Sequence, residues 1–149
     1  MVFIGWFLAC FGAAAIGAAS PPGEWYASLN KPAWNPPSWL FGPVWSALYL
    51  MMAVAAWRVW MRGGWKQQVK PLGFFVVQLA LNALWSPLFF GLKLPGVAFA
   101  EILCLLAMIA ATAWVFRPVD RAAAVLLLPY LAWVSFASVL NFTLWRMNS

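Results

Sequence analysis

The stretch W-Y-A-S-L-N-K-P-A-W-N-P-P-S-W-L-F-G-P-V-W, residues 25–45, sets how the rest of the chain is arranged. It holds four of the chain's twelve tryptophans and four of its eleven prolines. Because proline removes a backbone donor and pushes its predecessor out of the helical region, we expect no regular helix to run through the stretch. Tryptophan rings can pack together while their N–H groups reach the polar side of a membrane interface. We therefore predict an ordered loop that caps a membrane bundle.

The composition indicates an integral membrane protein. Hydrophobic residues make up 66% of the 149 residues, charged residues make up 8%, and the mean hydropathy is +0.85. Soluble domains are only about 45 to 50% apolar. The formal net charge is +6, but the basic residues are scattered at the ends of apolar runs. This placement is typical of membrane topology signals, so we expect no nucleic-acid partner.

Five apolar runs are each about long enough to cross a hydrocarbon core, which needs roughly 20 residues. Short connections containing proline, glycine or basic residues separate them and leave no room for a soluble domain. Pro87 and Pro129 predict a kink in the third run and a bend in the fifth. We predict an all-α fold with one membrane domain, residues 1–149. Its helices are expected over about residues 2–19, 40–61, 71–91, 96–116 and 121–146, with a lid loop over residues 20–39.

Basic residues predict the orientation of these helices. Six of the nine Lys and Arg residues lie on the side of the N-terminus, and three lie on the side of the tryptophan loop. The N-terminus is therefore expected on the cytoplasmic side if the protein lies in an inner membrane. In the first run small residues recur every fourth position, which favours packing against a neighbouring helix over a homodimer face. These residues are Gly5, Ala9, Ala13 and Gly17.

Polar and aromatic residues recur at helical spacing on three predicted helices. An amide in hydrocarbon must find a partner, so we expect these amides to point into the bundle. One interpretation is hydrogen bonding between helices and ring packing. We favour a pocket, because an aromatic cavity with a few polar groups is typical of small-molecule sites. The pattern comprises Trp45 and Tyr49 on the second helix, Gln78, Asn82, Trp85 and Phe89 on the third, and Tyr130, Trp133, Ala137 and Asn141 on the fifth.

The chain resembles the TspO/MBR family, the tryptophan-rich sensory proteins related to the mitochondrial translocator or peripheral benzodiazepine receptor. The matching segments are residues 25–39, 42–49, 78–91 and 129–142. The resemblance implies a five-helix fold and a cavity under the first loop that accepts tetrapyrroles such as protoporphyrin IX. In many members the cavity accepts cholesterol or benzodiazepine-like ligands. The residues that match the family's pocket are Trp45, Asn82, Tyr130, Trp133 and Ala137, those that match its lid are Trp34 and Trp39, and Leu140 completes our predicted ligand-binding set.

Two departures limit what the resemblance implies. The family's sterol motif near the end of the fifth helix reads here as Leu140, Phe142 and Arg146, so its tyrosine is missing and the support for a sterol ligand is weak. The Gly-xxx-Gly of some relatives reads here as Gly73-xxx-Val77, so a homodimer contact is not placed.

Three functions remain in competition. The first is a tetrapyrrole-binding sensor or translocator. The second is an enzyme that breaks down porphyrin with light and oxygen, using Trp45 and Trp133 as redox-active indoles, an activity reported for some relatives. The third is a proton-coupled exporter that uses Glu101, the one acidic residue well inside a predicted span. We favour the first, because the chain has neither a catalytic acid–base set nor repeated halves.

The residue types limit the cofactors. There is no histidine, which excludes a His-ligated haem and a histidine proton relay. The two cysteines lie in apolar runs without partners at metal-ligand spacing, so no metal site is expected. No cofactor is therefore required, and metal-free porphyrin is expected as a ligand. Its propionates would face Lys31 or Arg146, which alternatively serve as ordinary interface anchors.

Overall fold

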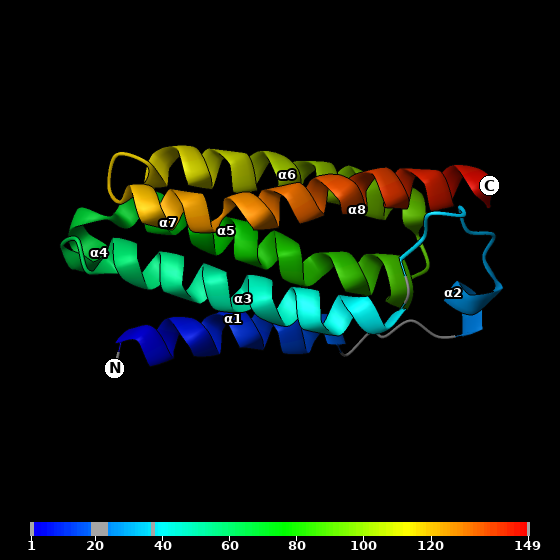
Figure 1. Ribbon diagram of the computed structural model, residues 1–149, viewed down its shortest axis with the longest axis horizontal. Helices are drawn as coiled ribbons and strands as arrows, with labels where there is room; N and C mark the ends of the chain where they lie inside the picture. The colour runs from blue at the N-terminus through cyan, green and yellow to red at the C-terminus, as the bar shows by residue number, and fades with distance from the viewer. Residues whose placement is uncertain (1, 19–23, 37, 149) are drawn as a thin grey trace.

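A computed structural model describes residues 2–18, 24–36 and 38–148 of the chain. Within these ranges every regular element is helical, which confirms the all-α prediction. The long helices run side by side along one axis, as Figure 1 shows. The long elements are α1 (Val2–Ala18), α3 (Ser38–Trp60), α5 (Val69–Ser86) with the π-helix η1 (Pro87–Gly91), α6 (Pro95–Phe116), and α7 (Arg121–Leu126) with α8 (Leu128–Met147). The short ones are α2 (Glu24–Ser28) and α4 (Gly64–Gln67).

Three helical segments among the described residues are long and apolar enough to cross a membrane. They are Val69–Gly91, Pro95–Phe116 and Arg121–Met147, with mean hydropathies of 1.6, 2.1 and 2.0. Val2–Ile16 is a shorter apolar helix. The chain is therefore a multi-pass integral membrane protein, and the count of five spans stays a prediction.

The long helices close into a ring. α1 packs against α3 and α5, and α6 packs against α5 and α8. α3 completes the ring by packing against α7. Because α7 is short and lies at the end of the bundle near α4, the contact between α3 and the last helical segment is concentrated at that end (Figure 1).

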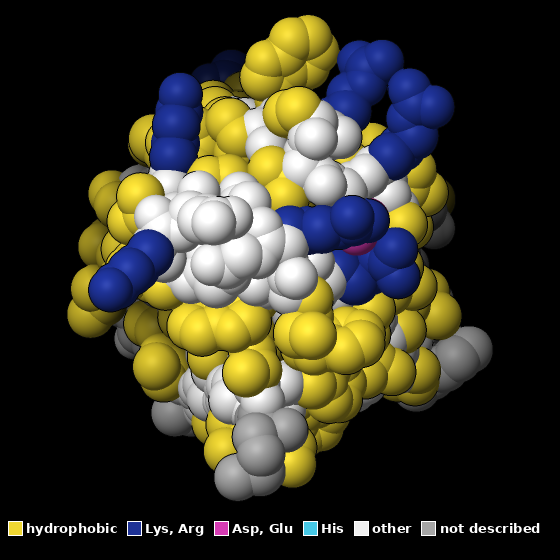
Figure 2. All heavy atoms as spheres, turned by 90° about the vertical axis from the view of Figure 1, so that its left-hand side faces the viewer, with side chains coloured by type: hydrophobic (Ala, Val, Ile, Leu, Met, Phe, Trp, Pro, Cys, Tyr) yellow, Lys and Arg dark blue, Asp and Glu magenta, His cyan; other side chains and the backbone are white. Residues whose placement is uncertain are grey.

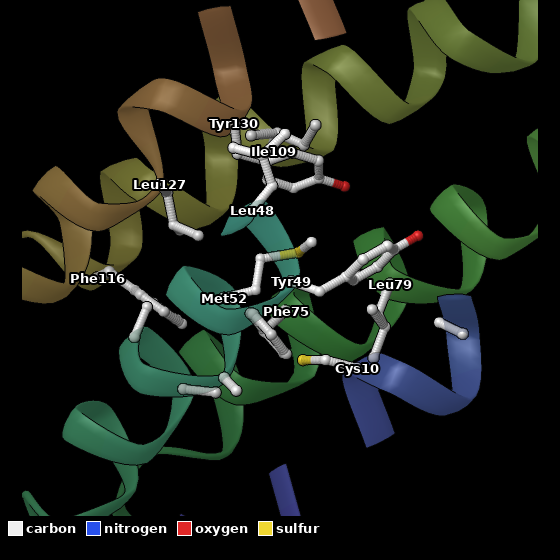
Figure 3. Packing of buried hydrophobic residues seen from close by; sticks show 14 of the residues in the cluster. Cys10, Leu48, Tyr49, Met52, Phe75, Leu79, Ile109, Phe116, Leu127 and Tyr130 are labelled. Carbon is white, nitrogen blue, oxygen red and sulfur yellow. The ribbon is translucent and has the colours of Figure 1, made fainter. Parts of the chain in front are cut away.

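Large buried side chains fill the middle of the ring. Figure 3 shows Met52, Phe75, Ile109 and Phe116 among the side chains that lie between the helices. The rings of Phe75 and Phe116 stack with centroids 6.1 Å apart. Fully buried alanines on α3 let its backbone approach neighbouring helices closely. These alanines are Ala53, Ala55 and Ala56.

The small residues of α1 do not all face the bundle. Ala13 is buried, whereas Gly5 and Ala9 are exposed. A Cβ built on Gly5 would meet no atom within 4 Å. The prediction that this stripe packs within the bundle is therefore wrong for its first half, because that half turns outward. A homodimer stays a prediction.

Both prolines with predicted distortions change the helices that contain them. Pro87 begins the π-helix η1, where the N–H of Leu92 donates to the carbonyl of Pro87 over 2.8 Å. The helix predicted over residues 121–146 is divided at Leu127, two residues before Pro129. Proline has no N–H to continue the helical ladder. The Leu127 N–H instead bonds the carbonyl of Ala124 over 3.1 Å, which ends α7.

Among the described residues no single helix runs through the whole of residues 25–45, as expected. α2 occupies the first part of this stretch, and α3 begins at Ser38 and continues through Pro43. Pro43 is the sixth residue of α3, so it lies beyond the first four N–H groups that lack helical partners, and the helix continues past it with one backbone bond fewer. Pro32 and Pro36 lie outside helices, as expected. Residues 20–23 and 37 of the predicted lid lie outside the described residues.

One end of the bundle is strongly basic. Figure 2 faces this end and shows Lys and Arg side chains around it. The ends of the elements that meet here carry Arg58, Arg62, Lys66, Lys70, Arg117 and Arg121. α1 also begins at this end (Figure 1), which confirms that these residues share the side of the N-terminus. The compartment that this side faces stays a prediction.

Asp120 is the buried acid of this end. Its carboxylate accepts from Arg58 Nε over 3.2 Å, from Arg62 over 3.4 Å and from the Ala123 N–H over 3.1 Å. The last bond caps α7 at its N-terminus. Burial alone would raise the pKa of the Asp120 carboxyl, but the Ala123 N–H and the two arginines outweigh it and lower the pKa below its ordinary value.

Candidate functional site

An apolar groove lies between α3 and α8. It is open to the surface and has a volume of about 500 Å³. This volume lies within the range of roughly 300 to 1,000 Å³ that is usual for small-molecule sites. Eight residues line it, four from each helix: Val44, Ala47, Leu48 and Met51, and Pro129, Ala132, Trp133 and Phe136.

The two walls of the groove have the same sequence spacing. On each helix the lining positions follow i, i+3, i+4 and i+7, which places them on one face. Ala47 and Ala132 are small and leave room between their larger neighbours. Trp133 supplies the largest ring, and its centroid lies 5.6 Å from that of Phe136.

The loop before α3 extends the aromatic wall on the α8 side. Trp34 contacts Phe136, with ring centroids 5.8 Å apart and planes at 69°. Trp34 is still 47% exposed, so one face of its indole stays open. Trp34 therefore lies beside the groove, and its role as a lid residue stays a prediction. The side chain of Trp39, the second predicted lid residue, lies outside the described residues.

Hydrogen bonds and rings hold the described part of this loop against the bundle. The Asn30 N–H donates to Asn148 Oδ1 over 2.8 Å, and Asn148 Nδ2 donates to the Asn30 carbonyl over 2.9 Å. The ring of Tyr26 lies edge-on to Phe90 of η1, with centroids 5.3 Å apart. The ammonium of Lys31 lies 4.8 Å from the Tyr26 ring. These contacts join the described part of the loop to the end of α8 and to η1, and an ordered loop stays a prediction.

A chain of hydrogen bonds crosses the interior next to the groove. The Tyr49 hydroxyl donates to Asn82 Oδ1, and Asn82 Nδ2 donates to the Tyr130 hydroxyl over 2.8 Å. That hydroxyl donates to Gln78 Oε1 over 2.8 Å, and Gln78 Nε2 donates to Met52 Sδ over 3.9 Å. All five residues are buried, and Figure 3 shows Tyr49, Met52 and Tyr130 among the core side chains. Gln78 and Asn82, two of the three predicted amides, therefore point inward and bond to protein groups.

A second set of polar bonds lies toward the end that carries α2. Trp85 Nε1 donates to Asn141 Oδ1 over 2.9 Å, and Asn141 Nδ2 donates to the Pro95 carbonyl over 2.9 Å. The ring of Trp85 stacks on Phe89 with centroids 5.1 Å apart. These contacts fix the beginning of α6 between α5 and α8.

Comparisons with known proteins agree with this helical architecture. The model of the TspO/MBR family matches residues 3–146. The chain belongs to the TspO/MBR family. It is 44% identical to a tryptophan-rich sensory protein of Cereibacter sphaeroides over 147 residues, which cover 99% of this chain and 91% of that protein. It is 48% identical to the translocator protein of Ovis aries over 127 residues, which cover 84% and 75%. Identity to the translocator protein of Homo sapiens is 43% over 146 residues, which cover 95% and 84%.

In this TspO/MBR chain the predicted site residues separate into three places. Trp133 lines the groove, with Trp34 beside it. Tyr49, Gln78, Asn82 and Tyr130 form the inner hydrogen-bond chain, and the Trp45 ring packs on Tyr49 and Tyr130 with centroids 5.6 and 6.3 Å away. Ala137 packs against the main core. Toward α2 lie Trp85, Phe89, Leu140 and Asn141.

Most residues of the groove were missed by sequence reasoning. Apart from Trp133, none of its lining residues was in the predicted set. Their i, i+3, i+4, i+7 spacing is visible in the sequence. However, a membrane helix is apolar all round, so this spacing does not distinguish one face from another.

Glu101 is the remaining predicted functional residue of this family member. It is only 8% exposed, and neither carboxylate oxygen has a hydrogen-bond partner among the described residues. It interacts electrostatically with Tyr130, and it does not line the groove. The described part of the chain contains no group of three or more acidic or cysteine side chains that would bind a metal.

Proposed function

We propose that this TspO/MBR protein binds a tetrapyrrole, protoporphyrin IX, in the groove between α3 and α8. Membership of a family that includes tryptophan-rich sensory proteins and translocator proteins supports a sensor or translocator role. The observation that carries the proposal is the aromatic wall of Trp34, Trp133 and Phe136 beside an open apolar groove. A flat conjugated macrocycle can stack on such rings.

The charges of the ligand fix its orientation in this proposal. The propionates of protoporphyrin are anionic and avoid hydrocarbon, so they point toward the membrane interface. At the loop end of the groove the bundle carries Lys31 and Arg146. The macrocycle then lies between α3 and α8, with five helices spanning the membrane around the buried core.

Two residues bear on the other ligand and the other reaction considered for this chain, Phe142 on a sterol and Trp133 on porphyrin breakdown. Phe142 takes the place of the tyrosine in the sterol motif, and its ring packs on Phe99 with centroids 5.2 Å apart. A sterol is therefore not part of this proposal. Porphyrin breakdown is the competing function, because the Trp133 indole lines the groove that would hold the ligand.

Filling the groove tests the proposed function. Ala132 lines the groove, whereas Ala110 is an exposed alanine on α6 that does not line it. Ala132→Phe is expected to weaken protoporphyrin IX binding about tenfold or more, a change of roughly 1.4 kcal/mol. Ala110→Phe is expected to bind like the wild type. The measurement is a titration of purified protein in detergent in the dark, and equal affinities for both variants would refute the groove as the site.

A time course in light separates binding from turnover. The absorbance spectrum of bound protoporphyrin IX is recorded with the wild-type protein in darkness and then in light. A spectrum that persists in light supports a binding protein. Loss of the porphyrin bands in light, at a rate above that of free porphyrin, would assign the enzyme activity instead.

A further inference from the structure

Glu101 lies in the interior of the bundle without a bonding partner. It is six residues into α6, which places it about 9 Å along the helix from Pro95. Glu101 is only 8% exposed, and neither carboxylate oxygen has a hydrogen-bond partner among the described residues. An ionised carboxylate is costly in such a place unless it is paired.

The helices packed against α6 supply no cation beside Glu101. These elements are α5, η1, α7 and α8. Their charged groups within the described residues are Lys70, Arg121 and Arg146. Lys70 and Arg121 lie at the opposite end of the bundle. Arg146 follows Trp145, whose indole lies against Gly96 and Phe99 at the start of α6, so Arg146 lies nearer the loop end of the bundle than Glu101 does.

On α8 the buried titratable group is Tyr130, which lies in the bundle interior as Glu101 does. The two interact electrostatically, and Tyr130 also interacts with Tyr49 of α3 and Cys10 of α1. The Tyr130 hydroxyl donates a hydrogen bond to Gln78 Oε1 and accepts one from Asn82 Nδ2. One lone pair of the hydroxyl oxygen remains as a hydrogen-bond acceptor. The Tyr130 hydroxyl therefore has no proton to donate to a carboxylate, whereas a carboxylic acid brings a donor of its own.

A proton fits this site better than a metal or an organic ligand. The described residues provide no cluster of metal-binding side chains, and Glu101 does not line the groove. The inner hydrogen-bond chain nevertheless includes Tyr130, with which Glu101 interacts electrostatically, and this chain runs beside the groove. Pro129 and Leu48 line the groove, and the residues that follow them, Tyr130 and Tyr49, belong to the inner chain.

We propose that Glu101 is a proton-binding site whose occupancy is linked to ligand binding in the α3–α8 groove. This inference rests on the proposed function. An anionic porphyrin in the groove repels a second negative charge at Glu101, and this repulsion is strong where the local dielectric constant is low. Ligand binding therefore promotes proton uptake by Glu101, and a protonated Glu101 promotes ligand binding by the same factor.

The test compares the affinities of the wild type and of Glu101→Gln for protoporphyrin IX from acidic to alkaline pH. Glutamine has the shape of the protonated acid and no charge. The two proteins are expected to bind equally at acidic pH, and the wild type is expected to bind roughly fivefold or more weakly at alkaline pH. Taking the ratio at each pH cancels the titration of the porphyrin itself. Glu24→Gln, on the exposed α2, is the matched control and is expected to follow the wild type.

Two outcomes overturn the linkage, and they are distinguishable. Porphyrin binding with a ratio that stays constant with pH overturns the linkage and leaves the proposed function intact. A wild-type protein that binds no porphyrin overturns both. Infrared difference spectra then decide about the proton site alone: the carbonyl stretch of a buried carboxylic acid is expected in the wild type and in Glu101→Asp, and is expected to be absent from Glu101→Gln. If the wild type lacks this band, Glu101 holds no proton.

Discussion

Asn82 on α5 donates a hydrogen bond to the hydroxyl of Tyr130 on α8 over 2.8 Å. α6 separates these two helices in the ring, so the bond crosses the interior of the bundle instead of joining neighbours. The bond from Trp85 to Asn141 also joins α5 to α8. Polar side chains thus fix the distance across the ring, while apolar side chains fill the contacts between adjacent helices.

Tyr130→Phe tests this bond directly. The substitution leaves the ring in place and removes the group that accepts from Asn82 and donates to Gln78. Both amides then lose a partner in a buried position, so the free energy of unfolding is expected to fall by roughly 1 to 3 kcal/mol. Denaturant unfolding in detergent measures the change. Tyr26→Phe is the control, because the Tyr26 ring is also buried but its hydroxyl has no hydrogen bond among the described residues; an equal loss in both variants would contradict the prediction.

Trp133→Phe is expected to weaken protoporphyrin IX binding about tenfold, since the indole that lines the groove is replaced by a smaller ring. Trp45→Phe is expected to have a smaller effect, because Trp45 packs on Tyr49 and Tyr130 instead of lining the groove. Trp114→Phe on the outer face of α6 is the control, with 71% of that residue exposed. Titrations in the dark rank the three variants. If Trp133→Phe binds like Trp114→Phe, Trp133 makes no contact with the ligand.

The carboxylate of Asp120 predicts a stability that depends on pH. Its pKa in the folded protein lies below the ordinary value of 3.8. A lowered pKa contributes stability above the ordinary value, and this contribution is lost as pH falls through the folded value. Melting temperatures of the wild type are therefore expected to fall below about pH 4, and those of Asp120→Asn are expected to fall less. Arg58 and Arg62 are partly exposed, so each ion pair contributes only about 1 kcal/mol or less. Glu24→Gln is the control and should lose melting temperature at low pH as the wild type does. If the melting temperature of Glu24→Gln also falls less, Asp120 is not the cause of the acid sensitivity.

The membrane fold and the inward direction of its amides were predictable from sequence for definite reasons. Long apolar runs need helices, because no water satisfies backbone groups in hydrocarbon. Gln78 and Asn82 had to face the interior, because lipid offers amides no partner. The bonds that they make to Tyr130 follow from that requirement.

The groove and the form of the proline distortions were not predictable in the same way. Val44 and Met51 look like any other apolar residues of a membrane helix, so their place on the groove depends on how α3 and α8 pack. Pro87 and Pro129 each indicate that one backbone hydrogen bond of the helix is lost. One gives a π-helix and the other a break at Leu127, because neighbouring helices decide how the freed groups are satisfied.

Asn148→Ala is expected to release the loop from the end of α8. Asn148 both accepts from and donates to the backbone of Asn30. Losing these two bonds is worth roughly 1 to 2 kcal/mol of local stability, so amide exchange at Asn30 and its loop neighbours should become about tenfold faster. Thr143→Ala is the control, since the Thr143 hydroxyl bonds only within α8, to Val139. Exchange in the wild type as fast as in a free peptide would refute an ordered loop altogether.

Ala137 lies one helical turn beyond Trp133 on α8 and packs against the main core, with part of its surface exposed. In Ala137→Thr the added hydroxyl can bond the carbonyl four residues earlier, as Ser135, Ser138 and Thr143 do on the same helix, so the new branch is the main change. Overpacking costs roughly 1 to 3 kcal/mol wherever it occurs, so stability alone does not identify a ligand contact. Ala111→Thr on α6 provides the matched comparison, because Ala111 is also partly buried and the next residue, Thr112, already bonds its helix backbone.

If the ligand extends from the groove past Trp133, Ala137→Thr should lower porphyrin affinity by more than its loss of thermal stability explains, and Ala111→Thr should not. Porphyrin titrations and melting curves of both variants in the same detergent measure the two quantities. Equal affinity losses would mean that position 137 contributes packing alone. The ligand would then end at the Trp133 ring, and the wall toward the loop would be formed by Phe136 and Trp34 without α8 residues beyond them.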